Sequence, residues 1–270
     1  MASASSWNGN ANANASKASN AYVAQSEIGR DRVICITGGN RGIGLELCKI
    51  FIARGCDVHA GCRKSSDGLR ELEKKANGKL HARILDVSDE RSIEEFAAGM
   101  KASGVEHIDV VINNAGVVGS DGYTKWDLEN TTMDEMVYVY KVNTCAPVLV
   151  TKYLFRNGLI GTSADGSETL VGNVTSKVGS IDDNGSGQGY AYRASKSALN
   201  MCNKSMSIDL ARSGVKFALL HPGWVRTGMT EGRGLIDASE SAAGLVAVLE
   251  GKFGDCERNW FDYKGETIPW

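Results

Sequence analysis

Short apolar runs alternate with amphipathic segments along most of this chain. Residues 32–36 form an apolar run rich in β-branched side chains, and residues 45–54 are apolar at helical spacing until Gly55 ends the pattern. Repeats of this pattern predict strands over residues 32–36, 57–62, 80–85, 109–114, 169–175, 216–220 and 260–263, and helices over residues 45–54, 67–76, 88–100, 133–153, 192–212 and 239–249. Ser88 is expected to cap the helix that begins there. Such alternation is typical of an α/β fold, a doubly wound parallel sheet with helices on both faces.

Residues 1–28 lack this periodicity. They are mainly Ala, Ser and Asn, with no acidic residue before Glu27, so we expect a flexible low-complexity extension. Residues 29–270 are expected to form one domain with an integral substrate pocket. The extension lacks the apolar core of a secretory signal. A transit peptide for an organelle is an alternative, because the segment is Ser-rich and acid-poor, although no Arg precedes Arg30.

The composition is that of an ordinary globular protein, with 270 residues, 42% hydrophobic and 23% charged, and a formal net charge of −2. No basic region suggests nucleic-acid binding, and no apolar run of about 18 residues predicts a membrane span. The seven cysteines form no CxxC pair, so we expect reduced thiols of a cytoplasmic protein and no metal site.

The segment TGGNRGIG, residues 37–44, joins the first strand to the first helix. Glycine tolerates positive φ and lets the backbone approach a ligand closely. The first turn of the helix presents unpaired N–H groups and a positive dipole end to a pyrophosphate. An ordinary Gly-rich turn is the alternative, but the flanking strand and helix favour a Rossmann-type dinucleotide site. The residues expected at this site are Gly38, Asn40, Arg41, Gly42, Ile43 and Gly44.

Basic residues surround the expected position of the adenosine ribose. An acidic residue about 20 residues after the glycines would favour NAD. Instead, Arg63 and Lys64 follow the second strand, and Arg41 lies inside the turn. Because Arg binds phosphate with a forked pair of donors, this arrangement favours NADP(H), unless Arg63 and Lys64 only solvate a strand end. Asp86, which precedes Val87 after the third strand, either accepts from the adenine amino group or is only a helix-entry acid.

Tyr192 and Lys196 stand four residues apart on a predicted helix and therefore share one face. A nearby ammonium group favours phenolate and would lower the Tyr pKa from about 10 towards a useful acid–base range. A surface pair is the alternative. The preceding strand favours chemistry, because Ser176 follows it at the carboxyl edge of the sheet, where α/β folds bind ligands. Ser176 is expected to hold the substrate oxygen while Tyr192 transfers the proton.

Together these motifs resemble the classical short-chain dehydrogenases/reductases. The resemblance rests on TGGNRGIG at 37–44, NNAG at 113–116, Asn143, Ser176, YRASK at 192–196 and PGWVRT at 222–227, which follow the family order over residues 32–227. The closing residues 261–270, residues 190–200 and HPGW at 221–224 are similar to one branch, the sniffer/C-factor-like carbonyl reductases.

The resemblance implies a role for each motif residue. Tyr192 would be the general acid in reduction, Lys196 would lower the pKa of Tyr192 and hold the nicotinamide ribose, and Ser176 would polarise the carbonyl. Asn143 would anchor a proton-relay water beside Lys196. The other implied cofactor contacts are Asn113, Ala115, Gly116, Pro222, Gly223, Val225 and Thr227.

Two rival residues lie close to the predicted catalytic ones. Tyr190 is a rival for Tyr192, but only Tyr192 has a Lys four residues later. Ser180 is a rival for Ser176, but the family serine stands three places before Gly179.

These residues predict an NADPH-dependent carbonyl reductase that transfers hydride to a ketone, aldehyde or quinone. The alternative is a non-catalytic NADP(H)-binding sensor or signalling protein on the same fold, because fold does not fix function. The intact set of Asn143, Ser176, Tyr192 and Lys196 argues against a sensor, which needs no proton donor. A sugar-nucleotide epimerase is less favoured, because such relatives space the glycines differently and carry a larger substrate domain.

The expected partner is a small carbonyl compound. The loops over residues 117–130 and 228–238 contain Tyr123, Trp126, Met229 and Leu235, which suggest a hydrophobic substrate, although simple loop packing would explain them equally. The resemblance also suggests a homodimer or tetramer formed through the helices around 133–153 and 192–212, although monomeric relatives exist.

Overall fold

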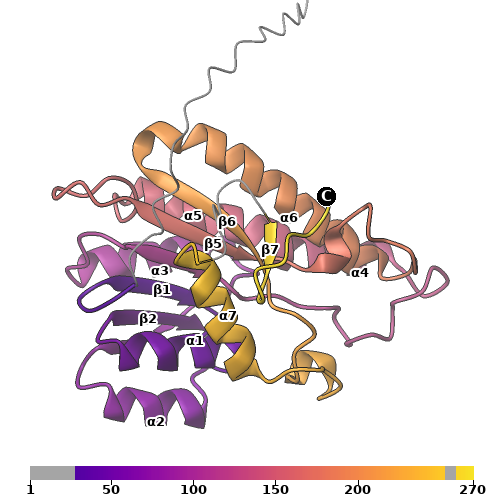
Figure 1. Ribbon diagram of the computed structural model, residues 1–270, viewed down its shortest axis with the longest axis horizontal. Coiled ribbons are helices and arrows are strands. Elements are labelled where there is room, and N and C mark those ends of the chain that lie inside the picture. The colour runs from indigo at the N-terminus through magenta and orange to yellow at the C-terminus, as the bar shows by residue number, and fades with distance from the viewer. Residues whose placement is uncertain (1–27, 253–259) are drawn as a thin grey trace, which may run out of the picture.

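The computed structural model describes residues 28–252 and 260–270. These residues form a seven-stranded sheet in the order β3-β2-β1-β4-β5-β6-β7, and every pair of neighbouring strands is parallel (Figure 1). The predicted doubly wound fold is therefore confirmed. The predicted extension lies outside the described residues except for Ile28, and so does Cys256.

The strands are β1 Val33–Thr37, β2 Asp57–Cys62, β3 Leu80–Ile84, β4 Val110–Asn113, β5 Thr169–Val174, β6 Val215–His221 and β7 Trp260–Asp262. The α-helices are α1 Gly42–Ala53, α2 Asp67–Lys75, α3 Glu90–Ala102, α4 Met133–Tyr140, α5 Ala146–Arg156, α6 Tyr190–Asp209 and α7 Ala238–Leu249. Short 3-10 turns cover Lys177–Gly179, Ala211–Ser213 and Gly228–Thr230. No helix in the two described ranges is both long enough and apolar enough to span a membrane.

Two predicted helices differ from the observed ones. The helix predicted over residues 133–153 is divided by a π-helical turn, Lys141–Cys145, between α4 and α5. The cap of α3 is Asp89, which accepts from the Arg91 amide at 3.2 Å, and not Ser88. Ser88 instead donates its hydroxyl to Asp86, two residues earlier, at 2.7 Å.

The apolar side chains form a core on each face of the sheet. On one face, Leu47 and Phe51 of α1 pack with Leu245 of α7. On the other, Phe96 of α3 packs with Leu154 of α5. With both faces covered, the central strands are apolar almost throughout, as buried parallel strands require. The strand order reverses between β1 and β4, and open α/β sheets bind ligands at the carboxyl ends of the strands beside such a reversal.

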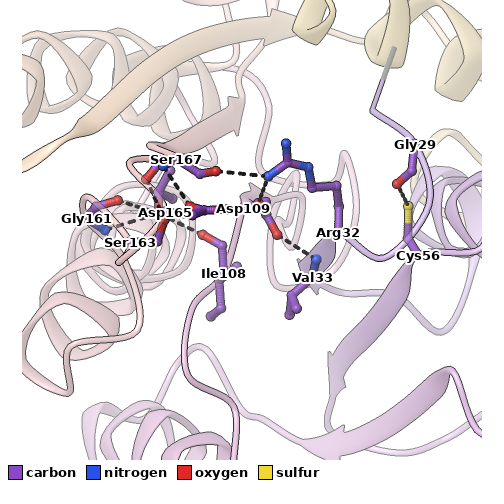
Figure 2. Close-up of polar contacts among 11 residues, drawn as sticks. Gly29, Arg32, Val33, Cys56, Ile108, Asp109, Gly161, Ser163, Asp165 and Ser167 are labelled. Carbon is purple, nitrogen blue, oxygen red and sulfur yellow. Dashed lines mark hydrogen bonds and ion pairs between the residues drawn. The ribbon is translucent and has the colours of Figure 1, made fainter. Parts of the chain in front are cut away.

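The amino-terminal edge of the sheet is held by polar contacts (Figure 2). Arg32, just before β1, donates to Asp109 at 2.6 Å and to Ser167 at 3.3 Å. The second oxygen of Asp109 accepts from the Val33 amide at 2.8 Å. These bonds join the starts of β1 and β4 to the segment before β5, so the three strands begin in a fixed alignment.

A buried acid closes the end of α7. Glu250, with its side chain 0% exposed, accepts from the Ile28 amide at 2.9 Å and from Arg54 at 2.5 Å, and pairs with Lys252 at 2.9 Å. Burial raises the pKa of Glu250, but the bonds from Lys252, Ile28 and Arg54 outweigh it and hold that pKa below its usual range. The carboxylate therefore stays ionised and joins the first described residues to α1 and α7.

Candidate active site

A cavity of about 540 Å³ lies at the carboxyl edge of the sheet. It is lined by the glycine turn after β1, the ends of β2 to β5, the start of α6 and the segment after β6. The predicted residues that line it are Gly38, Asn40, Arg41, Gly42, Ile43, Arg63, Asp86, Val87, Ala115, Gly116, Tyr192, Lys196, Pro222 and Thr227. The structure thus brings the predicted nucleotide site and the predicted catalytic pair into one cavity.

Some predicted cofactor contacts do not line this cavity. A Cβ on Gly44 would lie 2.3 Å from the Gly38 carbonyl oxygen, so Gly44 is needed for tight closure of the turn itself. Val225 is buried, and Gly223 has φ of +82°, where a Cβ would lie 2.8 Å from the Tyr263 ring. These residues shape the turns around the cavity and do not form its surface.

Asn113 lies away from the cavity, although it was expected to contact the cofactor. Its side chain is buried and donates to Asn173 Oδ1 at 2.8 Å, and Asn173 in turn donates to Asn203 Oδ1 at 2.8 Å. The amide at the cavity is that of the next residue, Asn114. Asn113 therefore does not line this cavity, and its role as a cofactor contact stays a prediction.

Asn114 joins the glycine turn to the end of β4. Its side chain donates to the carbonyl oxygens of Thr37 at 3.0 Å and Gly38 at 3.3 Å. The Thr37 hydroxyl accepts from the amides of Asn114 at 3.1 Å and Ala115 at 3.0 Å. The sequence shows two consecutive Asn residues before Ala115. Its periodicity does not reveal which of them bonds to the glycine turn.

Basic side chains occupy one end of the cavity. Arg41 and Arg63 are both exposed and both line it. Asn40 donates to the Lys64 carbonyl at 2.9 Å, which holds the glycine turn against the segment after β2. Asp86 lines the same end. Burial raises the pKa of Asp86, but the hydrogen bonds from Ser88 and the charge of Arg63 outweigh it and hold that pKa below its usual range. The carboxylate is therefore ionised.

At the other end of the cavity lie Lys196, which is buried, and Tyr192, which is half-buried. Lys196 Nζ lies 5.8 Å from the centre of the Tyr192 ring and donates to the Val174 carbonyl at 2.8 Å. Burial raises the pKa of Tyr192 to about 12, against a smaller lowering by its hydrogen bond with Ser176. Burial also lowers the pKa of Lys196 to about 8. The expectation that Lys196 lowers the pKa of Tyr192 is not met in this structure, because desolvation of the phenolate dominates.

Asn143 lies in the π-helical turn, with its side chain bonded to its surroundings. Its oxygen accepts from the Val117 amide at 2.9 Å, and its nitrogen donates to the Val117 carbonyl at 2.8 Å and to Ser195 Oγ at 3.0 Å. A Cβ on Gly116 would lie 3.2 Å from Asn143 Oδ1 and 3.7 Å from Lys196 Nζ, so both groups face Gly116. Asn143 thereby fixes the start of the 117–130 loop beside Lys196.

Aromatic residues of that loop cover Tyr192. The Trp126 ring lies 6.1 Å from the Tyr192 ring and 5.1 Å from the Tyr123 ring, measured between centroids. The Trp126 carbonyl accepts from the Gly189 amide at 2.6 Å. The Arg233 guanidinium lies 5.4 Å from the centre of the Tyr123 ring. The two loops predicted to form the substrate pocket are therefore in contact beside the predicted proton donor.

The chain matches a family model described as short chain dehydrogenase over residues 32–235. This chain belongs to the short-chain dehydrogenase/reductase family. Membership confirms the family resemblance and makes the chain an oxidoreductase by family.

Known members of the family are similar over most of this chain. C-signal of Myxococcus xanthus is 37% identical over 164 residues, which are 60% of this chain and 93% of that protein. The NADPH-bound carbonyl reductase from chicken fatty liver superposes with a TM-score of 0.74 at 31% identity, covering 89% of this chain and 100% of that one. Carbonyl reductase Sniffer of D. melanogaster superposes with a TM-score of 0.76 at 26% identity, again covering 89% and 100%.

The two rival residues of this short-chain dehydrogenase/reductase, Ser180 and Tyr190, lie outside the cavity. Ser180 donates its hydroxyl to the Trp270 carbonyl at 3.2 Å and accepts from the Asp183 amide at 3.1 Å. Tyr190 is 40% exposed and does not line the cavity. Ser176 does not line the cavity either, but its interaction with Tyr192 lowers the pKa of that phenol against the effect of burial.

Proposed function

We propose that this chain is an NADPH-dependent carbonyl reductase that reduces a ketone, aldehyde or quinone, with Tyr192 as the proton donor. The observation that carries the proposal is the single cavity in which Arg41 and Arg63 lie at one end and Tyr192 and Lys196 at the other. The chicken carbonyl reductase, which is similar over its whole length, has a structure with NADPH bound.

The lining residues fit a dinucleotide with a 2′-phosphate. The glycine turn and the start of α1 would hold the pyrophosphate, because the helix offers unpaired N–H groups there. Arg41 and Arg63 would hold the 2′-phosphate, and Asp86 the adenine. Thr227 lies beside Gly42, with its Cγ2 3.3 Å from the position of a Gly42 Cβ, and would contact the nicotinamide carboxamide or a phosphate. NADPH, when bound, supplies the hydride.

The chain's own residues supply the proton and the charge stabilisation. With a pKa of about 12, Tyr192 is protonated at neutral pH, as a donor to the developing alkoxide must be. Ser176, which interacts with the Tyr192 phenol, would position the carbonyl oxygen. Lys196, with a pKa of about 8, is mostly charged at neutral pH and would stabilise the phenolate left after proton transfer. Asn143 would support a water beside Lys196.

The substrate class follows from the apolar surroundings of Tyr192. Trp126 and Tyr123 cover one side, and Met229 lines the cavity. Trp224 and Leu235, in the segments flanking Met229, are 51% and 72% exposed. Such surfaces favour an aromatic or otherwise hydrophobic carbonyl compound.

Spectrophotometry at the reduced-nicotinamide band tests this proposal. NADPH and NADH are compared with diketones, quinones, aromatic aldehydes and ketosteroids, for the natural chain and for Tyr192→Phe. We expect NADPH-dependent turnover that Tyr192→Phe abolishes while NADPH binding is retained. Turnover that persists in Tyr192→Phe would refute the role of Tyr192. NADPH binding without turnover of any compound would favour the sensor function.

We also propose a cytoplasmic homo-oligomer. The six described cysteines are unpaired, which is typical of a reducing compartment. Large apolar side chains are exposed on α4, including Met133 at 74% and Val137 at 56%, and on α6, including Met201 at 68%. Light scattering coupled to size-exclusion chromatography tests the assembly, and a monomer at micromolar concentration would refute it.

A further inference from the structure

Three side chains that can bind metals meet at the amino-terminal end of β2 and β3, opposite the catalytic cavity. Asp57 and His59 lie two residues apart on β2 and point to the same face, and His81 of β3 is the register partner of His59. The sequence predicted no metal site, because residues 59 and 81 are distant in the chain and only the strand register brings them together.

The spacing of the three groups suits a metal ion. His81 Nε2 lies 2.8 Å from Asp57 Oδ1, and His59 Nε2 lies 3.9 Å from the same oxygen. All three candidate ligand atoms lie within 4.8 Å of one another, and the two imidazole rings are stacked with centroids 4.7 Å apart. Ligand atoms around tetrahedral Zn²⁺, with bonds of about 2.0 to 2.1 Å, are about 3.3 Å apart. Small side-chain shifts would therefore accommodate an ion.

One of these atoms, His59 Nε2, is buried without a hydrogen bond among the described residues. The His59 side chain is only 2% exposed, and Asp57 Oδ1, which lies 2.8 Å from His81 Nε2, is 3.9 Å from His59 Nε2, too far for a hydrogen bond. Buried polar atoms are nearly always paired in native proteins, so each such exception needs an explanation. A cation between Asp57 Oδ1 and His59 Nε2 would give the unpaired nitrogen a partner.

We propose that Asp57, His59 and His81 form a binding site for a divalent transition-metal ion of the Zn²⁺ class. Imidazole nitrogen and carboxylate oxygen are donors that Zn²⁺ accepts readily. The side chains of Asp57 and His81 are 40% and 39% exposed, and the three residues line an open groove of about 1070 Å³. An ion and a completing water ligand can enter from that groove.

Arg83 competes with the ion for His59. Its Nε donates to His59 Nδ1 at 2.8 Å, and its Nη2 donates to Ser103 Oγ at 2.7 Å. Because Nδ1 accepts this bond, the neutral ring carries its proton on Nε2. Metal binding through His59 Nε2 requires Arg83 to release Nδ1. The ring proton then leaves Nε2 to solvent, and solvent supplies a proton to Nδ1. The number of protons on the ring is unchanged, and Arg83 lowers the affinity of the site.

Titration of the full-length protein tests this site independently of the proposed reductase activity. The chelator-treated protein is titrated with Zn²⁺ by calorimetry and with Co²⁺ by visible spectroscopy. We expect one saturable site per chain, with Co²⁺ bands of tetrahedral nitrogen and oxygen coordination. His81→Gln and Asp57→Asn should each weaken binding by about tenfold or more. His107→Gln, which alters a histidine of the same groove outside the cluster, should leave binding unchanged.

Arg83→Met gives the decisive comparison. It removes the competing donor and a positive charge, so Zn²⁺ affinity should rise by about tenfold, and an adventitious surface site would not respond in this direction. Equal affinity in His81→Gln and the natural chain would overturn the proposal. So would thiolate charge-transfer bands with Co²⁺, or no saturable binding in Arg83→Met. Circular dichroism establishes that each variant is folded, and the two ligand substitutions serve as independent removals if one fails to fold.

Discussion

Glu135 anchors the loop that covers the catalytic cavity, and its replacement should loosen that loop. Its carboxylate is 3% exposed, accepts from the amide and hydroxyl of Ser120 at 2.8 and 2.6 Å, and lies 3.5 Å from Lys125 Nζ. Trp126, the residue after Lys125, packs against Tyr192. Glu135→Gln keeps the size of the side chain and removes its charge, so it tests the anchor with little change in packing.

The magnitude follows from the two Ser120 bonds. A hydrogen bond to a charged group contributes about 1.5–3 kcal/mol and a neutral one about 0.5–1.5 kcal/mol. Loss of the charge should therefore cost about 1 kcal/mol per bond, or about 2 kcal/mol in all. Since 1.4 kcal/mol corresponds to a factor of ten, opening of the loop should become about 30-fold more favourable.

The anchor should be complete at neutral pH. Burial raises the pKa of Glu135, but the bonds from Ser120 and Lys125 outweigh it and hold that pKa below its usual range. The stabilisation is therefore present above the unfolded pKa of about 4.3 and is lost only as the pH falls through the lower native value.

Hydrogen exchange measures the opening without knowledge of the substrate. At pH 7 the Ser120 amide of Glu135→Gln should exchange about 30-fold faster. Glu129→Gln makes the same change at an exposed position of the loop and should alter exchange by less than about twofold. In the reductase assay, kcat/KM for bulky aromatic carbonyls should fall while NADPH affinity is retained. Unchanged exchange in Glu135→Gln would refute the anchoring.

Three further predictions concern stability, the glycine turn and cofactor choice. Glu250→Gln should lower the free energy of unfolding by about 3 kcal/mol and Tm by about 6 to 12 °C in thermal unfolding. The loss should disappear as the pH falls through the depressed native pKa of Glu250, and Glu71→Gln, in an exposed pair, should cost less than about 0.5 kcal/mol. Gly44→Ala should weaken NADPH binding by about tenfold or more in fluorescence titrations, because its Cβ would meet the Gly38 carbonyl. Gly99→Ala, which has open space around it, should leave NADPH binding unchanged. Arg63→Ala should reduce the preference for NADPH over NADH by about tenfold to a hundredfold in kcat/KM, and an unchanged ratio would exclude this residue from phosphate binding.

The strands and most helices were predictable because burial on both faces imposes apolar runs that local sequence displays. The π-helical turn was not, because a single widened turn leaves the apolar periodicity almost unchanged. Pro147 in the first turn of α5 was the one available signal, since proline cannot complete the hydrogen bonding of a continuous helix. The cap of α3 was misplaced by one residue, which is within the precision of helix ends.

The site was predictable where one element carries its residues. Tyr192 and Lys196 share a helix face, so their spacing alone brought them together. Asn114 was missed because the direction of a side chain at the end of a strand depends on where the strand stops. The raised pKa of Tyr192 could not be read from the spacing of Tyr192 and Lys196, because it depends on desolvation by the folded surroundings of the ring.

The hydrogen-bonded row of Asn side chains at 113, 173 and 203 affects how the sheet assembles. Asn113 and Asn173 are register partners on β4 and β5, and Asn173 also donates to Asn203 of α6. If β5 slipped by one residue during folding, residue 173 would turn to the opposite face and leave the other two amides unpaired in an apolar interior. Amides carry no charge, so this penalty holds at any pH or salt concentration. The interior therefore selects against misaligned pairings, and the correct alignment of β5 and α6 fixes the distance between Ser176 and Tyr192.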